Sequence, residues 1–157
     1  MATRAMNPEI ETREGFTVVG IPHRASPQSD FAAIWDEFGQ RVHEYDGSPI
    51  EEAAYAVGYD YNDEIDEFTY LTGMRTDPDP EVPDGWEAID VPPQTYAVFT
   101  TTMAEAGEAM VQIYQEWLPV SEYSRGMGPE FEYYDEAFDA TDPDSTFTVH
   151  VPITSAK

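Results

Sequence analysis

The chain has 157 residues, 32 acidic and 7 basic side chains, a net charge of −25 and no cysteine. The length suits one domain, and the absence of cysteine excludes disulfides and thiol chemistry. The small number of Lys and Arg residues argues against direct DNA binding, because contacts to phosphates need basic patches.

The first half of the chain predicts the order strand, helix, strand, strand. A β-rich run with a proline stop, GFTVVGIPH, precedes a helix for which Ser29 or Asp30 is the predicted N-cap. Apolar residues recur at helical spacing within that helix. Two segments that favour strands then form a hairpin around a turn at residues 62–64. These elements are predicted at residues 15–23, 29–45, 53–61 and 67–76.

The same order returns after a linker rich in Pro and Asp at residues 77–90. The second helix carries apolar side chains along one side and ends at Pro119. A turn at residues 139–145 precedes the last strand. The strand, helix, strand and strand of this half are predicted at residues 95–102, 103–119, 129–138 and 146–153.

The two halves read as an internal duplication, although two ordinary hairpin units could match by coincidence. Phe68 and Phe147 are 79 residues apart, and Tyr59 and Tyr134 are 75 apart. We expect one α+β domain with duplicated strand-helix-strand-strand units, an antiparallel sheet, two main helices and a cleft between the halves, where ligands commonly bind. The domain is predicted at residues 8–154, with pseudo-repeats at 8–76 and 91–154.

The acidic composition points to the solvent rather than to a partner. Aromatic residues make up 13% of the chain and are spread along it, which argues against disorder. An acidic surface with a single lysine, Lys157, resembles that of cytosolic proteins from salt-accumulating halophiles, whose carboxylates stay hydrated and screened. We therefore expect a halophilic source and a cytoplasmic location. Residues 1–7 are expected to be an N-terminal extension, and neither a signal core nor a membrane-spanning run is seen.

Several segments carry a family resemblance. They are VPPQTYAVF, IYQEWLP, SEYSRGMGPEFEYYDEAFD and VPI in the second half, and VVGIPHR, IWDEF, YAVGYDY and FTYLTGM in the first. Together they resemble the GyrI-like small-molecule-binding domain, the effector-binding part of some AraC-type and MerR-type multidrug regulators. The resemblance covers nearly the whole chain, and its second-half motif is the more specific.

The resemblance implies a pocket between the halves that binds hydrophobic, often cationic or aromatic compounds. The family's pocket glutamate, in a strand motif P-x-F-E-x-Y, matches Glu132. Family members include drug-sensing regulators, a gyrase inhibitor and a branch that hydrolyses cyclopropane-bearing DNA alkylators, whose full constellation this chain does not match. Since no room remains for a helix-turn-helix, we expect a stand-alone domain.

Glu132 is either one more solvated charge or a carboxylate held among aromatic rings. In a strand, Glu132 shares a face with Tyr134, whereas Phe131 and Tyr133 share the other. A carboxylate buried among aromatics is unfavourable unless it is paired, and a cationic ligand would both neutralise it and gain cation–π attraction. Glu130 is expected to be a surface charge on the same strand.

The duplication suggests the opposite wall of the site. Aligning Tyr59 with Tyr134 places Val57 opposite Glu132, so Tyr55, Val57 and Tyr59 are predicted to face it, although hairpin stacking explains these tyrosines nearly as well. Aromatic residues on the helices are core or partly exposed to ligand, and Trp86 packs on the linker or covers the pocket. The predicted ligand-binding residues are Glu132, Tyr134, Tyr55, Tyr59, Trp35, Tyr70, Trp86, Tyr96, Tyr114 and Trp117.

Other chemistries leave no signature. His23, His43 and His150 are scattered, which predicts no metal site, and the acidic pairs lack the pattern of a calcium loop. No phosphate loop, nucleophile elbow or dinucleotide fingerprint is present, so no cofactor is expected.

Three functions follow as hypotheses. The first is capture of a hydrophobic, cationic or aromatic small molecule, for sequestration or effector sensing. The second is hydrolysis of a reactive electrophile with Glu132 as general base. The third is a protein-interaction role, such as gyrase inhibition, with a protein partner or a homodimer, which predicts an exposed apolar patch.

Overall fold

The computed structural model describes residues 8–26, 28–45, 47, 50–62, 64–126, 128–139 and 141–154, and the predicted N-terminal extension lies outside them. The strands of the described part are β1 (Glu9–Arg13), β2 (Phe16–Ala25), β3 (Ala54–Asn62), β4 (Glu67–Thr76), β5 (Glu87–Val91), β6 (Gln94–Thr102), β7 (Ser124–Arg125), β8 (Glu130–Tyr134) and β9 (Thr146–Thr154). The helical segments are α1 (Phe31–Arg41), η1 (Val42–Glu44), α2 (Ala106–Gln112), η2 (Ile113–Trp117) and α3 (Leu118–Val120).

The strands form one antiparallel sheet, which confirms the predicted α+β class. Its order is β1-β6-β9-β8-β3-β4-β2-β5, and β7 pairs with β9 off this path. The two predicted halves meet where β8 pairs with β3. Each short edge strand pairs with the opposite half of the sheet. The strand β1 pairs with β6 of the second half, and β5 pairs with β2 of the first.

The main elements lie close to their predicted positions, and β4 has the predicted bounds. Three short strands, β1, β5 and β7, were not predicted. The strand β5 begins at Glu87, inside the stretch predicted to be a linker, and pairs with β2. It is mostly exposed and only five residues long, so its hydrophobic pattern is weak.

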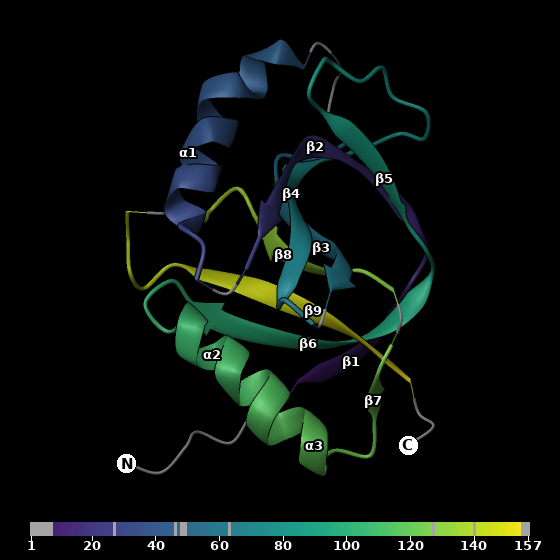
Figure 1. Cartoon of the computed structure of the whole chain (residues 1–157), viewed down its shortest axis with the longest axis vertical. Coiled ribbons are helices and arrows are strands. Elements are labelled where there is room, and N and C mark those ends of the chain that lie inside the picture. Colours follow the sequence, from purple (N-terminus) through teal and green to yellow (C-terminus); the bar gives the residue numbers. More distant parts are fainter. Residues whose placement is uncertain are drawn as a thin grey trace.

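Two short connections make the sheet curl. Only Glu14 and Gly15 separate β1, at one edge, from β2 near the other edge, and only Pro92 and Pro93 separate β5 from β6. Because one residue spans at most about 3.6 Å, the two edges must approach each other. The sheet is therefore an incomplete barrel with an inner and an outer face, as Figure 1 shows.

The inner face carries its own core. The rings of Phe16 in β2 and Phe131 in β8 are 5.2 Å apart, although β3 and β4 separate these strands in the sheet. This contact is possible only across the inside of the curl. The buried residues of the inner core are Phe16, Val18, Tyr55, Val57, Leu71, Val91, Tyr96 and Phe131.

Both helices cover the outer face (Figure 1). Asp30 caps α1, as predicted, by accepting a hydrogen bond from the Ala33 backbone N–H at 3.1 Å. From α1, Phe38 packs over Val19 and Ile21 of β2. The second helical run begins at Ala106 and continues through a π-helical turn, η2, to Val120, so Pro119 lies in its last turn. Its Ile113 is fully buried against β6 and β9.

A pair of glycines allows the backbones of β2 and β4 to approach closely. Gly20 pairs with Gly73, and a Cβ atom on Gly73 would lie 2.1 Å from the Val19 carbonyl oxygen. Since this oxygen belongs to a buried backbone that cannot retreat, Gly73→Ala should lower the free energy of unfolding by about 2 kcal/mol or more in urea denaturation.

The matched control is Gly39→Ala in the interior of α1, where a Cβ atom meets nothing within 4 Å. This change should raise the free energy of unfolding by about 0.5–1 kcal/mol, because alanine favours a helix. Equal stability of the two variants would contradict the close approach.

Candidate functional site

The residues of β8 divide between the two faces of the sheet. Glu130, Glu132 and Tyr134 lie on the outer face, as the alternation predicted, and Phe131 lies on the inner face. Across from them in β3, Ala56 pairs with Glu132 and Gly58 pairs with Glu130. These small neighbours leave room above the sheet for two carboxylates side by side.

Glu132 is held by tyrosine hydroxyls. Tyr70 and Tyr134 both donate to its Oε1, at 3.0 and 2.5 Å. The Trp35 indole N–H donates to the Tyr70 hydroxyl at 3.2 Å, and the edge of the Trp35 ring meets Tyr134 at 5.1 Å. Four of the residues predicted to bind ligand, from α1, β4 and β8, therefore lie together.

Glu130 belongs to the same site, so its assignment as a surface charge is wrong. The Tyr61 hydroxyl donates to Glu130 Oε1 at 2.5 Å, and the hydroxyl of Tyr114, from η2, donates to Oε2. We call the group the carboxylate–tyrosine cluster. It consists of Glu130, Glu132, Tyr61, Tyr70, Tyr114, Tyr134 and Trp35.

A β-bulge brings Tyr61 into the cluster. The pairing of β3 with β4 shifts between Tyr59 and Asn62, and Asp60 has a φ of 56°. An extra residue in a strand reverses the alternation beyond it, so Tyr59 faces inward and Tyr61 faces outward, against Phe68. Sequence alternation alone could not place Tyr61, although an Asp in a Tyr-Asp-Tyr strand end is a weak signal for a positive φ.

The cluster shifts the pKa of its acidic groups upward. Burial raises the pKa of Glu130 to about 7, the Tyr61 hydroxyl opposes this, and the charge of Glu132 adds to it. Burial also raises the pKa of Glu132, and the hydroxyls of Tyr134 and Tyr70 oppose it. Burial, followed by the negative charge of Glu132, holds the pKa values of Tyr70 and Tyr134 well above 10, so both remain neutral donors.

Glu132 has no cationic partner among the described residues. Arg125 of β7 contacts the cluster through Tyr61, with its guanidinium 4.7 Å from the Tyr61 ring centroid. The site therefore offers two carboxylates, neutral hydroxyl donors and aromatic rings.

Part of the predicted wall lies elsewhere. Val57 pairs with Phe131, not with Glu132, so Tyr55, Val57 and Tyr59 face the inner side of the sheet and the predicted wall is wrong. The alignment of Tyr59 with Tyr134 was one residue out of step, and a one-residue slip turns every side chain to the other face. Tyr96 is also inside, where its hydroxyl accepts a hydrogen bond from Gln94 at 2.6 Å.

Two of the predicted tryptophans make their ring contacts with residues outside the carboxylate–tyrosine cluster. Trp86 is buried beside Phe38, stacks on Tyr45 and donates to Glu44 at 3.1 Å, so it packs beside the end of α1 and does not cover the cluster. Trp117 meets Phe99 edge-on and stacks on Tyr123 beneath the second helix.

A cavity of about 660 Å³ opens beside inner-face side chains such as Tyr55 and His150, and its lining also includes Ala109 and Gln112 of the second helix. Residues of both halves line it, including Tyr55 and Arg75 from the first and Tyr133 and His150 from the second. The carboxylate–tyrosine cluster and this cavity are thus separate features, because no residue of the cluster lines the cavity.

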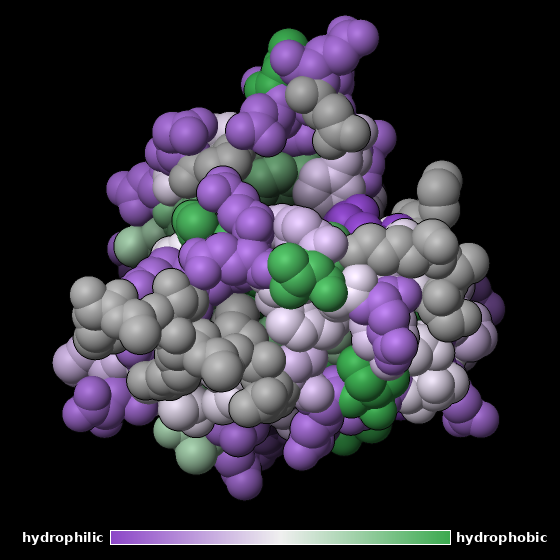
Figure 2. All heavy atoms as spheres, turned by 90° about the horizontal axis from the view of Figure 1, so that it is seen from below, coloured by the Kyte–Doolittle hydropathy of each residue, from purple (hydrophilic) through white to green (hydrophobic). Residues whose placement is uncertain are grey.

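Other site types find little support in the described part of the chain. It holds no group of three or more side chains that could bind a metal ion, and none of its helices is long and apolar enough to cross a membrane. On the face seen in Figure 2, the most hydrophobic residues form separate spots among hydrophilic ones rather than one patch.

Solved structures share this fold. A structure of SAV2435 bound to tetraphenylphosphonium has a TM-score of 0.73 at 16% identity, over 95% of this chain and 94% of that one. The C-terminal domain of EcmrR has a TM-score of 0.72 at 14% identity, over 98% and 100% of the two chains. A hydrolase from Listeria innocua has a TM-score of 0.55 at 9% identity, over 95% and 92%.

A sequence relative and a family model agree with this likeness. The chain is 32% identical over 154 residues to the transcriptional regulator BrlR of Pseudomonas aeruginosa. The match covers 96% of this chain but only 56% of BrlR, so the chain spans about half of that relative. The model of the GyrI-like small molecule binding domain matches residues 6–153, and the chain belongs to this family.

Proposed function

We propose that the carboxylate–tyrosine cluster binds a hydrophobic cation. The observation that carries the proposal is Glu132, a carboxylate enclosed by aromatic side chains and without a cationic partner among the described residues. A charge in such a place is unfavourable unless it is compensated. Glu132 is not needed for the stability of the fold, since an apolar residue would pack well beside Trp35 and Tyr134.

Binding would exchange neutral donors for a positive charge. In the free protein, the hydroxyls of Tyr70 and Tyr134 satisfy Glu132 Oε1. A cation that displaces them gains the full Coulomb attraction in a medium of low dielectric constant. The rings of Trp35 and the tyrosines then offer cation–π contacts and flat apolar area. The ligand class that fits is therefore a lipophilic monocation or an aromatic cation.

Similar proteins support the proposal that this chain binds a hydrophobic cation. SAV2435 has been solved with tetraphenylphosphonium, a lipophilic cation, and BrlR is named a transcriptional regulator. By this analogy we propose that the chain senses a compound as an effector domain. With 32 acidic residues against 7 basic ones, its own surface is unsuited to contact DNA, so the signal would pass through a protein partner or a further domain.

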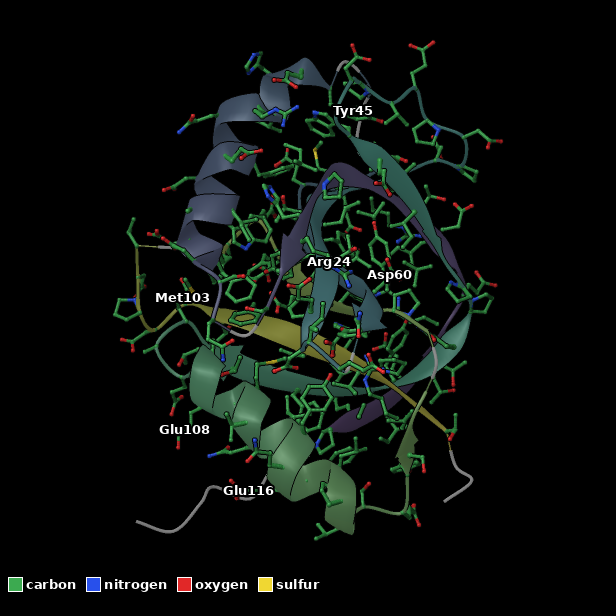
Figure 3. All side chains as sticks on the ribbon, viewed as in Figure 1. Arg24, Tyr45, Asp60, Met103, Glu108 and Glu116 are labelled. Carbon is green, nitrogen blue, oxygen red and sulfur yellow. The ribbon has the colours of Figure 1, made fainter. Side chains whose placement is uncertain are left out.

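Tetraphenylphosphonium is the probe for a direct test. Wild-type protein should bind it saturably in isothermal titration calorimetry, and Glu132→Gln should weaken binding by at least about tenfold, because glutamine keeps the shape and removes the charge. The matched control is Glu116→Gln, which removes one charge from the outer side of the second helix (Figure 3).

The control variant should bind within about twofold of wild type, since an exposed charge is screened by salt. Loss of affinity to the same extent in both variants would mean that only the overall negative charge attracts the cation. Absence of saturable binding to the wild type would reject the proposal.

A pH dependence follows from Glu130. Because its pKa is about 7, raising the pH through neutrality ionises it and adds a second negative charge beside Glu132. The affinity for tetraphenylphosphonium should therefore rise by about tenfold between about pH 6 and pH 8. Glu130→Gln should bind with nearly the same affinity at both values, and a slope that survives this substitution would contradict the assignment.

Hydrolysis is the second candidate, favoured by the raised pKa of Glu132 and by the fold likeness to a hydrolase from Listeria innocua. A carboxylate of raised pKa flanked by two tyrosine donors suits a general base that takes a proton from water. With a cyclopropane-bearing alkylator in excess, an enzyme would consume many equivalents and Glu132→Gln would abolish turnover. Consumption of one equivalent or none would leave binding alone.

A further inference from the structure

The cavity beside Tyr55 and His150 is a second, independent place for a ligand. It lies at the mouth of an incomplete barrel, which is a common position for ligand sites. Its volume of about 660 Å³ suits a small organic molecule. The aromatic rings of Tyr55 and Tyr133 contribute to its lining, and neither belongs to the carboxylate–tyrosine cluster.

Two guanidinium groups converge on this cavity. Arg13 and Arg75 both line it, and their Cζ atoms lie 4.8 and 5.6 Å from the centroid of the Phe16 ring. Arg13 also lies 5.3 Å from the Phe131 centroid. Such convergence is unexpected in a chain with only six arginines and a net charge of −25.

Arg13 has no carboxylate partner within the described part of the chain, although acidic side chains outnumber basic ones by more than four to one. Arg75 lies 3.8 Å from Glu51, and its buried Nε has no hydrogen-bond acceptor among the residues that the structure describes. Glu51 is in turn occupied by the hydroxyls of Tyr55 and Tyr133, at 2.7 and 3.2 Å. Of the described carboxylates, only Glu51 lies within salt-bridge distance of either guanidinium.

His150 lines the cavity and has an unsatisfied polar atom among the described residues. The side chain is 5% exposed, stacks on Phe131 at 4.2 Å and shares a hydrogen bond between Nε2 and Thr148 at 2.9 Å. Its Nδ1 is buried and has no partner among the described residues. Burial, and then the charge of Arg13, lower the pKa of His150 to about 3, so the imidazole is neutral. In the tautomer in which Thr148 donates to Nε2, Nδ1 carries the proton and is a free donor among the described residues.

We propose that this cavity binds a small organic monoanion with a flat apolar body, such as an aromatic carboxylate. Arg13 and Arg75 would hold the carboxylate, the His150 Nδ1–H would donate to it, and Tyr55 and Tyr133 would contact the ring system. A guanidinium is well suited to this role, because its planar fork matches a carboxylate.

The rest of the lining restricts the charge of the ligand. Glu9, Glu11, Glu105 and Glu108 also line the cavity and are exposed. They come from β1 and from the start of the second helix, toward solvent. Their field would oppose a second negative charge on the ligand, so a monoanion is favoured over a dianion.

The test uses 2-naphthoate, a fluorescent aromatic monoanion, in equilibrium titrations at fixed ionic strength and about pH 8. The wild type should bind it saturably, and Arg13→Gln should weaken binding by about tenfold or more, as expected for loss of a charge-assisted hydrogen bond. The neutral 2-naphthamide and the dianionic 2-naphthyl phosphate should each bind at least about tenfold more weakly to the wild type.

The matched control is Arg24→Gln. Arg24 is bound to the Asp60 carbonyl at 2.8 Å and lies near Asp60 in Figure 3, remote from the cavity lining. The Arg24→Gln substitution removes the same charge, and its affinity for 2-naphthoate should stay within about twofold of that of the wild type. Arg13→Lys keeps the charge but not the fork, and should be intermediate. Thermal unfolding of each variant verifies that it is folded.

Three results would overturn the proposal. They are no saturable binding of 2-naphthoate to the wild type, equal losses in Arg13→Gln and Arg24→Gln, or equal affinity for the acid and the amide. Glu132→Gln separates this site from the carboxylate–tyrosine cluster, because it should leave 2-naphthoate binding unchanged whether or not the protein binds cations. A loss there would show that the anion does not bind in the cavity.

Discussion

The fold depends on the connection of opposite sheet edges by pairs of residues. Glu14–Gly15 and Pro92–Pro93 tie β1 to β2 and β5 to β6, so the sheet cannot stay flat. Curling gives it an inner face, filled by its own aromatic core, and an outer face, which two helices cover. Every later feature follows from this separation. A side chain on a central strand either enters the barrel or lies beneath the helices, and a single residue of register decides which.

That sensitivity explains how far the sequence could predict the structure. Alternation in β8 and the helical spacing of α1 correctly placed Glu132 and Tyr134 together and put Trp35 on the apolar side of its helix. The duplication predicted the element order. Residues of β3 and β8 lie on the same face of the sheet only when their numbers differ by an even number, as Ala56 and Glu132 do. The alignment of Tyr59 with Tyr134 used a difference of 75, which is odd. This one-residue error moved Tyr55 and Tyr59 to the wrong face.

Tyr61 and Glu130 show a second limit. The bulge at Asp60 depends on a backbone conformation that few sequence signals specify, so Tyr61 could not be assigned to the outer face. Glu130 was judged by composition, because one glutamate among 32 acidic residues is usually solvated. Its tyrosine partners come from β3 and η2, and only the folded chain brings these segments together. Long-range partners of this kind, rather than local pattern, decide whether a carboxylate is solvated or functional.

The two faces also keep opposite charges apart. Glu132 and Phe131 are adjacent in β8, yet Glu132 faces outward without a cation, and Phe131 faces inward beneath Arg13, which has no carboxylate partner in the described part of the chain. The sheet lies between the Glu132 carboxylate and the Arg13 guanidinium and prevents them from forming an ion pair, although both lie next to β8. In most acidic proteins an unpaired arginine would find a nearby carboxylate. Here the alternation of one strand separates a carboxylate and a guanidinium that have no ion-pair partner in the described part of the chain, each among aromatic rings where a ligand of opposite charge gains most.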